Sequence, residues 1–211
     1  SRRSARTGTS YTINYQYLFL RQIAKDVTVR VSEPWSGSKQ QPLSLCSIAS
    51  TLGLLVAATS RGIALYDLPK LHESFKTAER NSVPTASALH TFDTEGHVQY
   101  VAFADHDARL VCALIDGRIL AWETSSLRDG FSTPHMVNPP GSNCHLLALE
   151  PNSGDRSTLC LVVYGPEPTL GSGGTAYILD LSQSSWSAPL PCSGVTAVNW
   201  STRGKQLVAG C

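Results

Sequence analysis

The chain has 211 residues, of which 42% are apolar and 16% are charged, and its formal net charge is +1. This length can bury the core of one globular domain, and the near-neutral charge excludes a strong overall field that attracts nucleic acid or anionic lipid. Charged residues fall below the roughly 25% of typical soluble domains, which favours strands and turns over helices. No apolar run approaches the roughly 20 residues of a membrane-spanning helix, so we expect no membrane insertion.

The first 16 residues are basic and rich in Ser and Thr, and they lack the apolar segment of a secretion signal. We expect residues 1–16 to form a disordered tail rather than the end of a transit peptide. The basic arm within it consists of Arg2, Arg3 and Arg6. We expect this arm to be solvated rather than to contact RNA.

The segment YLFLRQIAKDVTVRVSEPW, residues 17–35, comes next. In it Val27, Val29 and Val31 alternate with polar residues, as in a half-exposed strand. We therefore predict a lead-in strand within residues 17–35.

Four later stretches share one pattern, and they lie near residues 43–80, 98–127, 145–182 and 195–211. Each has an apolar strand, a polar turn and a second apolar strand, and the first three continue through a Gly-containing turn into a third strand. The ends of the first strands, placed at Ala49, Phe103, Leu149 and Trp200, are 54, 46 and 51 residues apart. Repeats of this length with three or four strands are typical of propeller blades.

The turns and the strands between them agree with this interpretation. Asp116-Gly117 lies between VCALI and RILAW and predicts a hairpin, since Gly tolerates a positive φ. The third repeat has a longer tip, Gly165 to Gly174, which we expect to be an exposed loop. The runs LLVAA, LVCALI and LCLVVY suit strands covered on both faces by neighbouring blades. A short helix is expected at Leu68 to Arg80.

The predicted fold is therefore all-β: a partial WD40-like propeller over residues 17–211, with about three and a half blades. Because closed rings have four to eight blades, we expect the chain to be a fragment of a longer protein. The alternative is a four-bladed ring whose last sheet is completed by the N-terminal segment.

Three segments resemble one known family, the N-terminal propeller of the large cytoplasmic-filament FG nucleoporin of the nuclear pore, in its fungal type. They are YLFLRQIAKDVTVRVSEPW, LSLCSIASTLGLLVAATSRGIALYDLPKL and VTAVNWSTRGKQLVAGC, in the family's order. The last segment matches the family pattern at Val195, Thr196, Val198, Trp200, Ser201, Gly204, Lys205, Gln206 and Leu207. The resemblance runs from Tyr17 to Cys211 and is loose between about Asn81 and Pro191.

The resemblance implies a seven-bladed propeller that binds a DEAD-box RNA helicase, and other nucleoporins, at the cytoplasmic face of the pore. It places the helicase contact on blades beyond the middle of the ring. No position of this sequence matches that contact, so no partner-binding residue is assigned. Trp35 and the loop from Gly165 to Gly174 are the candidates for an interaction surface on this part of the chain.

No motif for catalysis, a cofactor or a metal is recognisable. The six histidines, which share no HxxxH or HxH spacing, are His72, His90, His97, His106, His135 and His145. The six cysteines, which form no CxxC pair and are expected to be mostly buried and reduced, are Cys46, Cys112, Cys144, Cys160, Cys192 and Cys211. Turn or strand-end roles are expected for Asp105, Asp107, Asp116 and Asp180. Trp122 and Trp200 are expected in the core or between blades, whereas Trp35 and Trp186, beside Pro and Ser, are candidates for exposure.

The absence of such motifs favours a non-enzymatic docking scaffold without a cofactor. The family resemblance implies that this scaffold lies at the cytoplasmic face of the nuclear pore and supports messenger RNA export by recruiting a helicase. The alternative is a generic WD40-like adapter of another intracellular complex. A third class, a propeller hydrolase, would need a central cluster of His and carboxylate residues that the sequence does not reveal.

Overall fold

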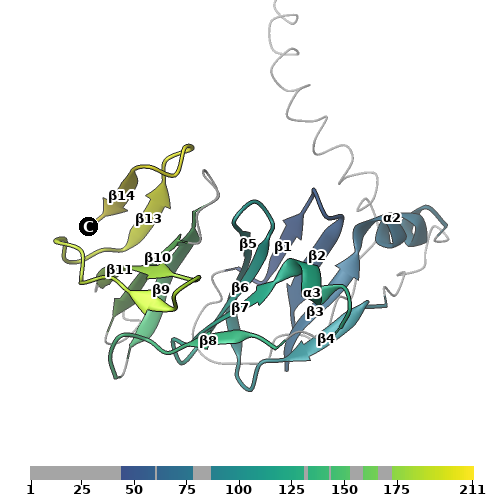
Figure 1. Cartoon of the computed structure of the whole chain (residues 1–211), viewed down its shortest axis with the longest axis horizontal. Helices are drawn as coiled ribbons and strands as arrows, with labels where there is room; N and C mark the ends of the chain where they lie inside the picture. Colours follow the sequence, from purple (N-terminus) through teal and green to yellow (C-terminus); the bar gives the residue numbers. More distant parts are fainter. Residues whose placement is uncertain are drawn as a thin grey trace, which may run out of the picture.

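The computed structural model describes residues 44–59, 61–77, 87–130, 133–142, 144–152, 159–165 and 173–211. The expected tail, the expected lead-in strand and most of the expected loop after Gly165 lie outside these residues. Antiparallel sheets stand side by side in chain order across the molecule (Figure 1). This arrangement confirms the prediction of a partial all-β propeller.

Three of the sheets have four strands, each paired with the next along the chain. Blade one contains β1 (Cys46–Ala49), β2 (Leu54–Ala58), β3 (Gly62–Asp67) and β4 (His90–Asp93). Blade two contains β5 (Val98–Ala104), β6 (Arg109–Leu114), β7 (Ile119–Glu123) and β8 (His135–Val137). Blade three contains β9 (His145–Pro151), β10 (Leu159–Gly165), β11 (Thr175–Asp180) and β12 (Ser185–Trp186). A final hairpin, called blade four, contains β13 (Ala197–Trp200) and β14 (Leu207–Gly210).

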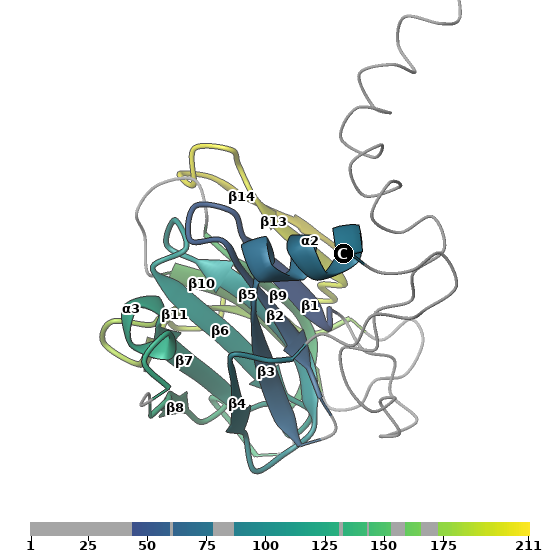
Figure 2. The ribbon, with the colours of Figure 1, turned by 90° about the vertical axis from the view of Figure 1, so that its right-hand side faces the viewer.

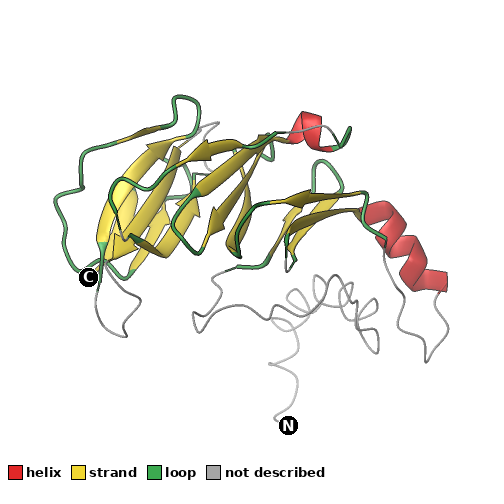
Figure 3. Ribbon diagram, turned by 90° about the horizontal axis from the view of Figure 1, so that it is seen from below, coloured by secondary structure: helices red, strands yellow, loops and turns green. Residues whose placement is uncertain are grey.

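The first strands of successive blades lie next to one another. Ser44, just before β1, forms a parallel bridge with Tyr100 of β5, and the Val101 N–H donates to the Ser44 carbonyl oxygen at 2.9 Å. Contacts also join β5 to β9 and β9 to β13. Seen from below, the sheets follow each other along a curve, as blades do around a propeller axis (Figure 3).

The strand β6 shows why its sequence lacks polar alternation. Leu110, Cys112 and Leu114 pack into a core shared with blade one, while Val111 and Ala113 pack into a core shared with blade three. All five side chains are fully buried. Both faces of the strand are therefore covered by neighbouring sheets, as the run LVCALI predicts.

Two helices interrupt the strands in the described ranges. The helix α2 (Leu68–Thr77) confirms the predicted helix, whose last three expected residues lie outside the described part. Its start is capped by Asp67, whose Oδ1 accepts a hydrogen bond from the Lys70 N–H at 3.0 Å. Leu71 then packs on Ala57, Ala64 and Tyr66 of blade one, and Figure 2 shows α2 beside this sheet. The short helix α3 (Thr124–Leu127) follows β7.

The sequence pattern showed three strands in each of the first three blades, whereas the structure has four. The structure adds β4, β8 and β12 after the predicted limits of residues 80, 127 and 182. These outer strands have only four, three and two residues, and most of their side chains are exposed or half-buried. Such short, solvent-facing edge strands carry too few apolar residues to show a period.

Candidate docking surface and the pocket between blades two and three

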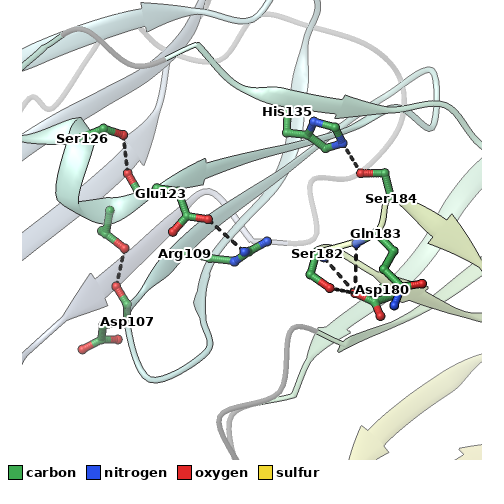
Figure 4. A network of polar contacts seen from close by, with 10 residues as sticks. Asp107, Arg109, Glu123, Ser126, His135, Asp180, Ser182, Gln183 and Ser184 are labelled. Atoms are coloured by element: carbon green, nitrogen blue, oxygen red, sulfur yellow. Dashed lines mark hydrogen bonds and ion pairs between the residues drawn. The ribbon is translucent and has the colours of Figure 1, made fainter.

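A pocket of about 290 Å³ opens between blades two and three. Its floor includes the apolar side chains of Ala121 in β7 and Leu181 after β11. Its polar lining consists of Arg109, Glu123, Ser126, Thr133, His135 and Ser182. Figure 4 shows Arg109 between Glu123 on one side and the turn that carries Ser182 on the other.

Arg109 and Glu123 face each other across the β6–β7 ladder. The Arg109 Nη2 atom lies 2.9 Å from the Glu123 Oε1 atom, and their side chains are 18% and 58% exposed. An ion pair with this much solvent contributes less than about 1 kcal/mol to stability. The main effect of this ion pair is therefore to hold the Arg109 guanidinium at the pocket, and its effect on the stability of the fold is small.

The turn between β11 and β12 forms the opposite wall of the pocket. The Asp180 carboxylate accepts hydrogen bonds from the Ser182 and Gln183 backbone N–H groups, at 2.8 and 3.3 Å, and from the Ser182 hydroxyl at 2.6 Å. Ser184, which has a φ of 53°, contacts the His135 Nε2 atom through its hydroxyl oxygen. The turn of blade three is thereby linked to β8 of blade two (Figure 4).

Aromatic side chains make a second link between these blades. The Tyr164 hydroxyl donates to the Gly117 carbonyl oxygen at 2.7 Å, and the Trp186 Nε1–H donates to the Asn138 carbonyl oxygen at 2.8 Å. Tyr164, Tyr177 and Trp186 form a cluster with ring centroids 5.6 to 6.3 Å apart. Burial raises the pKa of Tyr164, so this hydroxyl stays protonated and keeps donating.

Blades three and four are joined in the same way. The Trp200 Nε1–H donates to the Glu150 carbonyl oxygen at 2.9 Å, and the Asn152 Nδ2 atom donates to the Gly204 carbonyl oxygen at 2.9 Å. Blades two, three and four are thus fixed to one another by side-chain donors on backbone carbonyls. Turns carried by such sheets present a preorganised surface to a partner.

A model of one family, the NUP159/214 beta propeller, matches residues 40–211 of the chain. The chain belongs to this family. The assignment confirms the resemblance seen in the sequence and extends it through the blades where the sequence match was loose.

A curated relative agrees with the family assignment. Nucleoporin NUP159 of Chaetomium thermophilum is 28% identical over an alignment of 200 residues, and the alignment covers 89% of this chain and 13% of that protein. The chain therefore spans about one eighth of the length of this relative.

Two solved structures share the fold of this propeller chain. One is the S. cerevisiae complex of Dbp5 bound to Nup159, Gle1, IP6 and ADP, with a TM-score of 0.55, 14% identity, and 77% of this chain and 36% of that chain covered. The other is the mitotic checkpoint complex, with a TM-score of 0.53, 17% identity, and 80% and 43% covered. At these identities the likeness shows the propeller fold alone.

The tryptophan predictions can be compared with this family fold. Trp122 is 1% exposed and packs beside Phe92 of blade one, and Trp200 bridges two blades, so both predictions are confirmed. Trp186, a candidate for exposure, is half-buried against Tyr164 and Tyr177. Trp35 and most of the candidate loop lie outside the described residues.

The cysteines of this propeller are only partly buried. All six are free, but only Cys112 and Cys160 are buried, while Cys46 and Cys211 are exposed. The expectation that most are buried was therefore wrong, because β1 and the residue after β14 present their thiols to solvent. Burial raises the pKa of Cys160 to about 12 and raises that of Cys112 as well, so neither thiol is an available nucleophile.

The aspartates expected at turns and strand ends lie there. Asp116 orders the β6–β7 hairpin, because its Oδ1 atom accepts from the Arg118 N–H at 3.1 Å, and Asp105 and Asp107 lie in the β5–β6 turn with positive φ. Across the described ranges, no three His, Cys, Asp or Glu side chains come together as a metal ion requires. No helix of these ranges is long and apolar enough to cross a bilayer.

The pocket itself was not foreseen from the sequence. It depends on the approach of Arg109 to a turn more than 70 residues later, which no local pattern encodes. One signal was present: Asp180 with Ser182 two residues later is a side-chain-capped turn pattern, and it marks the pocket wall.

Proposed function

We propose that the chain forms part of a non-enzymatic docking scaffold of the nuclear pore. The scaffold stands at the cytoplasmic face and recruits a DEAD-box RNA helicase, which supports messenger RNA export. The observation that carries this proposal is the match of the NUP159/214 propeller to residues 40–211. Further support comes from the fold likeness to a chain of the complex of Dbp5 with Nup159.

The physical role of the blades in this proposal is rigid presentation. Inter-blade hydrogen bonds such as Tyr164 to Gly117 and Trp200 to Glu150 hold the sheets in fixed relation. Turns at the ends of the sheets then meet a partner without paying a large ordering entropy. In this proposal the helicase contact lies on later blades of the ring, so the described blades act by completing and stiffening the propeller.

The charge and chemistry of the chain fit a scaffold better than an RNA-binding protein or an enzyme. Its net charge of +1 supplies little long-range attraction for phosphates. Among the described residues, the buried thiols Cys112 and Cys160 have raised pKa values, which opposes a role as nucleophiles.

A second candidate function is that of a WD40-like adapter in a different intracellular complex. A chain of the mitotic checkpoint complex resembles this fold about as closely as a chain of the Dbp5–Nup159 complex does. Because the same propeller architecture occurs in both complexes, the adapter function is retained as an alternative. The two functions differ in the partner that the full-length protein captures.

The test compares capture of a purified DEAD-box helicase by the immobilised full-length protein and by this chain alone. An unrelated WD40 propeller serves as the control surface. We expect capture by the full-length protein and none by the chain or the control. Equal capture by the chain would contradict the placement of the contact on later blades. Absence of capture by the full-length protein would contradict helicase recruitment and favour the adapter.

A further inference from the structure

The sequence contains a single Ser/Thr-Pro dipeptide, Thr133-Pro134. It lies immediately before β8, the outer edge strand of blade two. Thr133 is exposed, and its side chain makes no hydrogen bond or ion pair with any residue that the structure describes. Because a residue before proline is restricted to extended conformations, this threonine is presented in the form in which protein kinases bind substrate segments.

The threonine shares its pocket with a cation that has unused donors. A guanidinium carries five N–H donors, and within the described chain only the Nη2 atom of Arg109 forms a hydrogen bond or ion pair, with Glu123. The Nε and Nη1 groups remain for a second anion. His135 and Ser182 add further polar atoms to the same lining, and Glu123 is its carboxylate.

We propose that Thr133 is a phosphorylation site for a proline-directed Ser/Thr kinase, and that Arg109 binds the resulting phosphate. In the reaction the Thr133 Oγ1 atom attacks the γ-phosphorus of ATP, and the bond from that phosphorus to the β-phosphate oxygen breaks. The hydroxyl proton is lost to solvent or to the kinase base, and ADP leaves. The inference does not depend on helicase recruitment, because it rests on this pocket alone.

The phosphate would change the charge balance of the pocket. A phosphothreonine carries about −1.5 to −2 charges at neutral pH and three acceptor oxygens. A planar guanidinium pairs with such a group in a bidentate manner, while the Glu123 carboxylate is repelled by it. Arg109 therefore exchanges a solvent-exposed carboxylate partner for a doubly charged one, and the link before β8 becomes tied to the start of β6.

The modification is tested by incubating the full chain with ATP and a proline-directed kinase, followed by mass spectrometry of the digested protein. We expect one phosphate on Thr133. The matched variant Pro134→Ala keeps the threonine but removes the recognition element, and we expect it to lose the label. A folded chain without phosphate at Thr133 would overturn the proposal, whether or not a synthetic peptide of the same segment is labelled. Equal labelling of Pro134→Ala would overturn the proline-directed assignment.

The role of Arg109 is tested by ³¹P NMR titration of the phosphorylated chain. The second pKa of a phosphothreonine is about 6, and we expect a lower value in the folded chain because Arg109 favours the dianion. In Arg109→Gln it should return to about 6. The control Arg118→Gln removes an arginine of blade two that pairs with Asp116 and does not line the pocket, and it should leave the pKa low. Equal pKa values for the unaltered chain and Arg109→Gln would contradict phosphate binding by Arg109.

Discussion

The Tyr164 hydroxyl of blade three donates to the Gly117 carbonyl oxygen of blade two, 47 residues earlier in the chain, at 2.7 Å. Gly117 is the hairpin residue that the sequence marks by its Asp-Gly pair, and its φ is +86°. Gly117 therefore has two roles: it forms the β6–β7 hairpin turn, and its carbonyl oxygen binds the next blade.

The variant Tyr164→Phe removes the hydroxyl donor and leaves the buried Gly117 carbonyl oxygen without this hydrogen bond. We expect the free energy of unfolding to fall by about 1–2 kcal/mol, measured by urea denaturation followed by tryptophan fluorescence. Tyr177→Phe is the matched control, because its ring belongs to the same cluster but its hydroxyl makes no hydrogen bond to a described residue. A change beyond about 0.5 kcal/mol in this control, or none in Tyr164→Phe, would contradict the assigned role.

The variant Gly117→Ala tests the close approach of the two blades. An added Cβ would lie 2.7 Å from the Cys144 carbonyl oxygen, in addition to the cost of a positive φ. Gly194 also has a positive φ, +71°, but nothing lies within 4 Å of its added Cβ. We expect Gly194→Ala to cost about 1 kcal/mol and Gly117→Ala at least about 2 kcal/mol more. Equal losses in thermal or urea unfolding would show that the blades tolerate the extra methyl group.

Thiol labelling tests the division of the cysteines. A thiol reagent should modify the exposed Cys46 and Cys211 rapidly in the folded chain, and Cys112 and Cys160 more than about 100-fold more slowly. The slow pair is fully covered by neighbouring sheets, so its labelling follows blade opening. Mass spectrometry of timed samples assigns the sites, and rapid modification of Cys112 would show that blades one and two are not packed together.

The pH dependence of stability should carry a contribution from Glu150. Burial raises the pKa of this carboxyl above its ordinary value of 4.5, so the folded chain holds the proton to higher pH than the unfolded chain. Stability from this group is therefore fully present below pH 4.5 and is lost as pH rises through the folded pKa. Glu150→Gln should be less sensitive to pH above 4.5, as measured by unfolding at several pH values. An identical slope in both proteins would contradict this sign.

The strands that the sequence predicted best are those with sheets on both sides. The second and fourth repeats have the same register across their first hairpins, because Phe103 pairs with Leu110 and Trp200 pairs with Leu207, seven residues later in each case. Here a turn of fixed length and long apolar runs specify the pairing without help from distant residues. The Asp116-Gly117 hairpin was predictable for the same reason.

The outer strands and the pocket were beyond local reasoning. The strand β12 has two residues, and Trp186 within it is half-buried only because Tyr164 and Tyr177 reach it from neighbouring strands. In the same way, the sequence shows Arg109 only as a cation at the start of a strand, and its place in the pocket depends on the neighbouring blade three. Both features arise from the stacking of one blade on the next, which the spacing of the repeats indicates but does not specify in detail.

The central claim is that this propeller serves as a docking scaffold, and one calorimetric measurement tests it most directly. A DEAD-box RNA helicase is titrated into the full-length protein and into the same protein lacking residues 44–211. We predict binding to the first and its loss in the second, because in the proposed function these blades complete the ring that positions the contact. Equal affinity for both proteins would contradict the account, since the propeller would then take no part in holding the helicase.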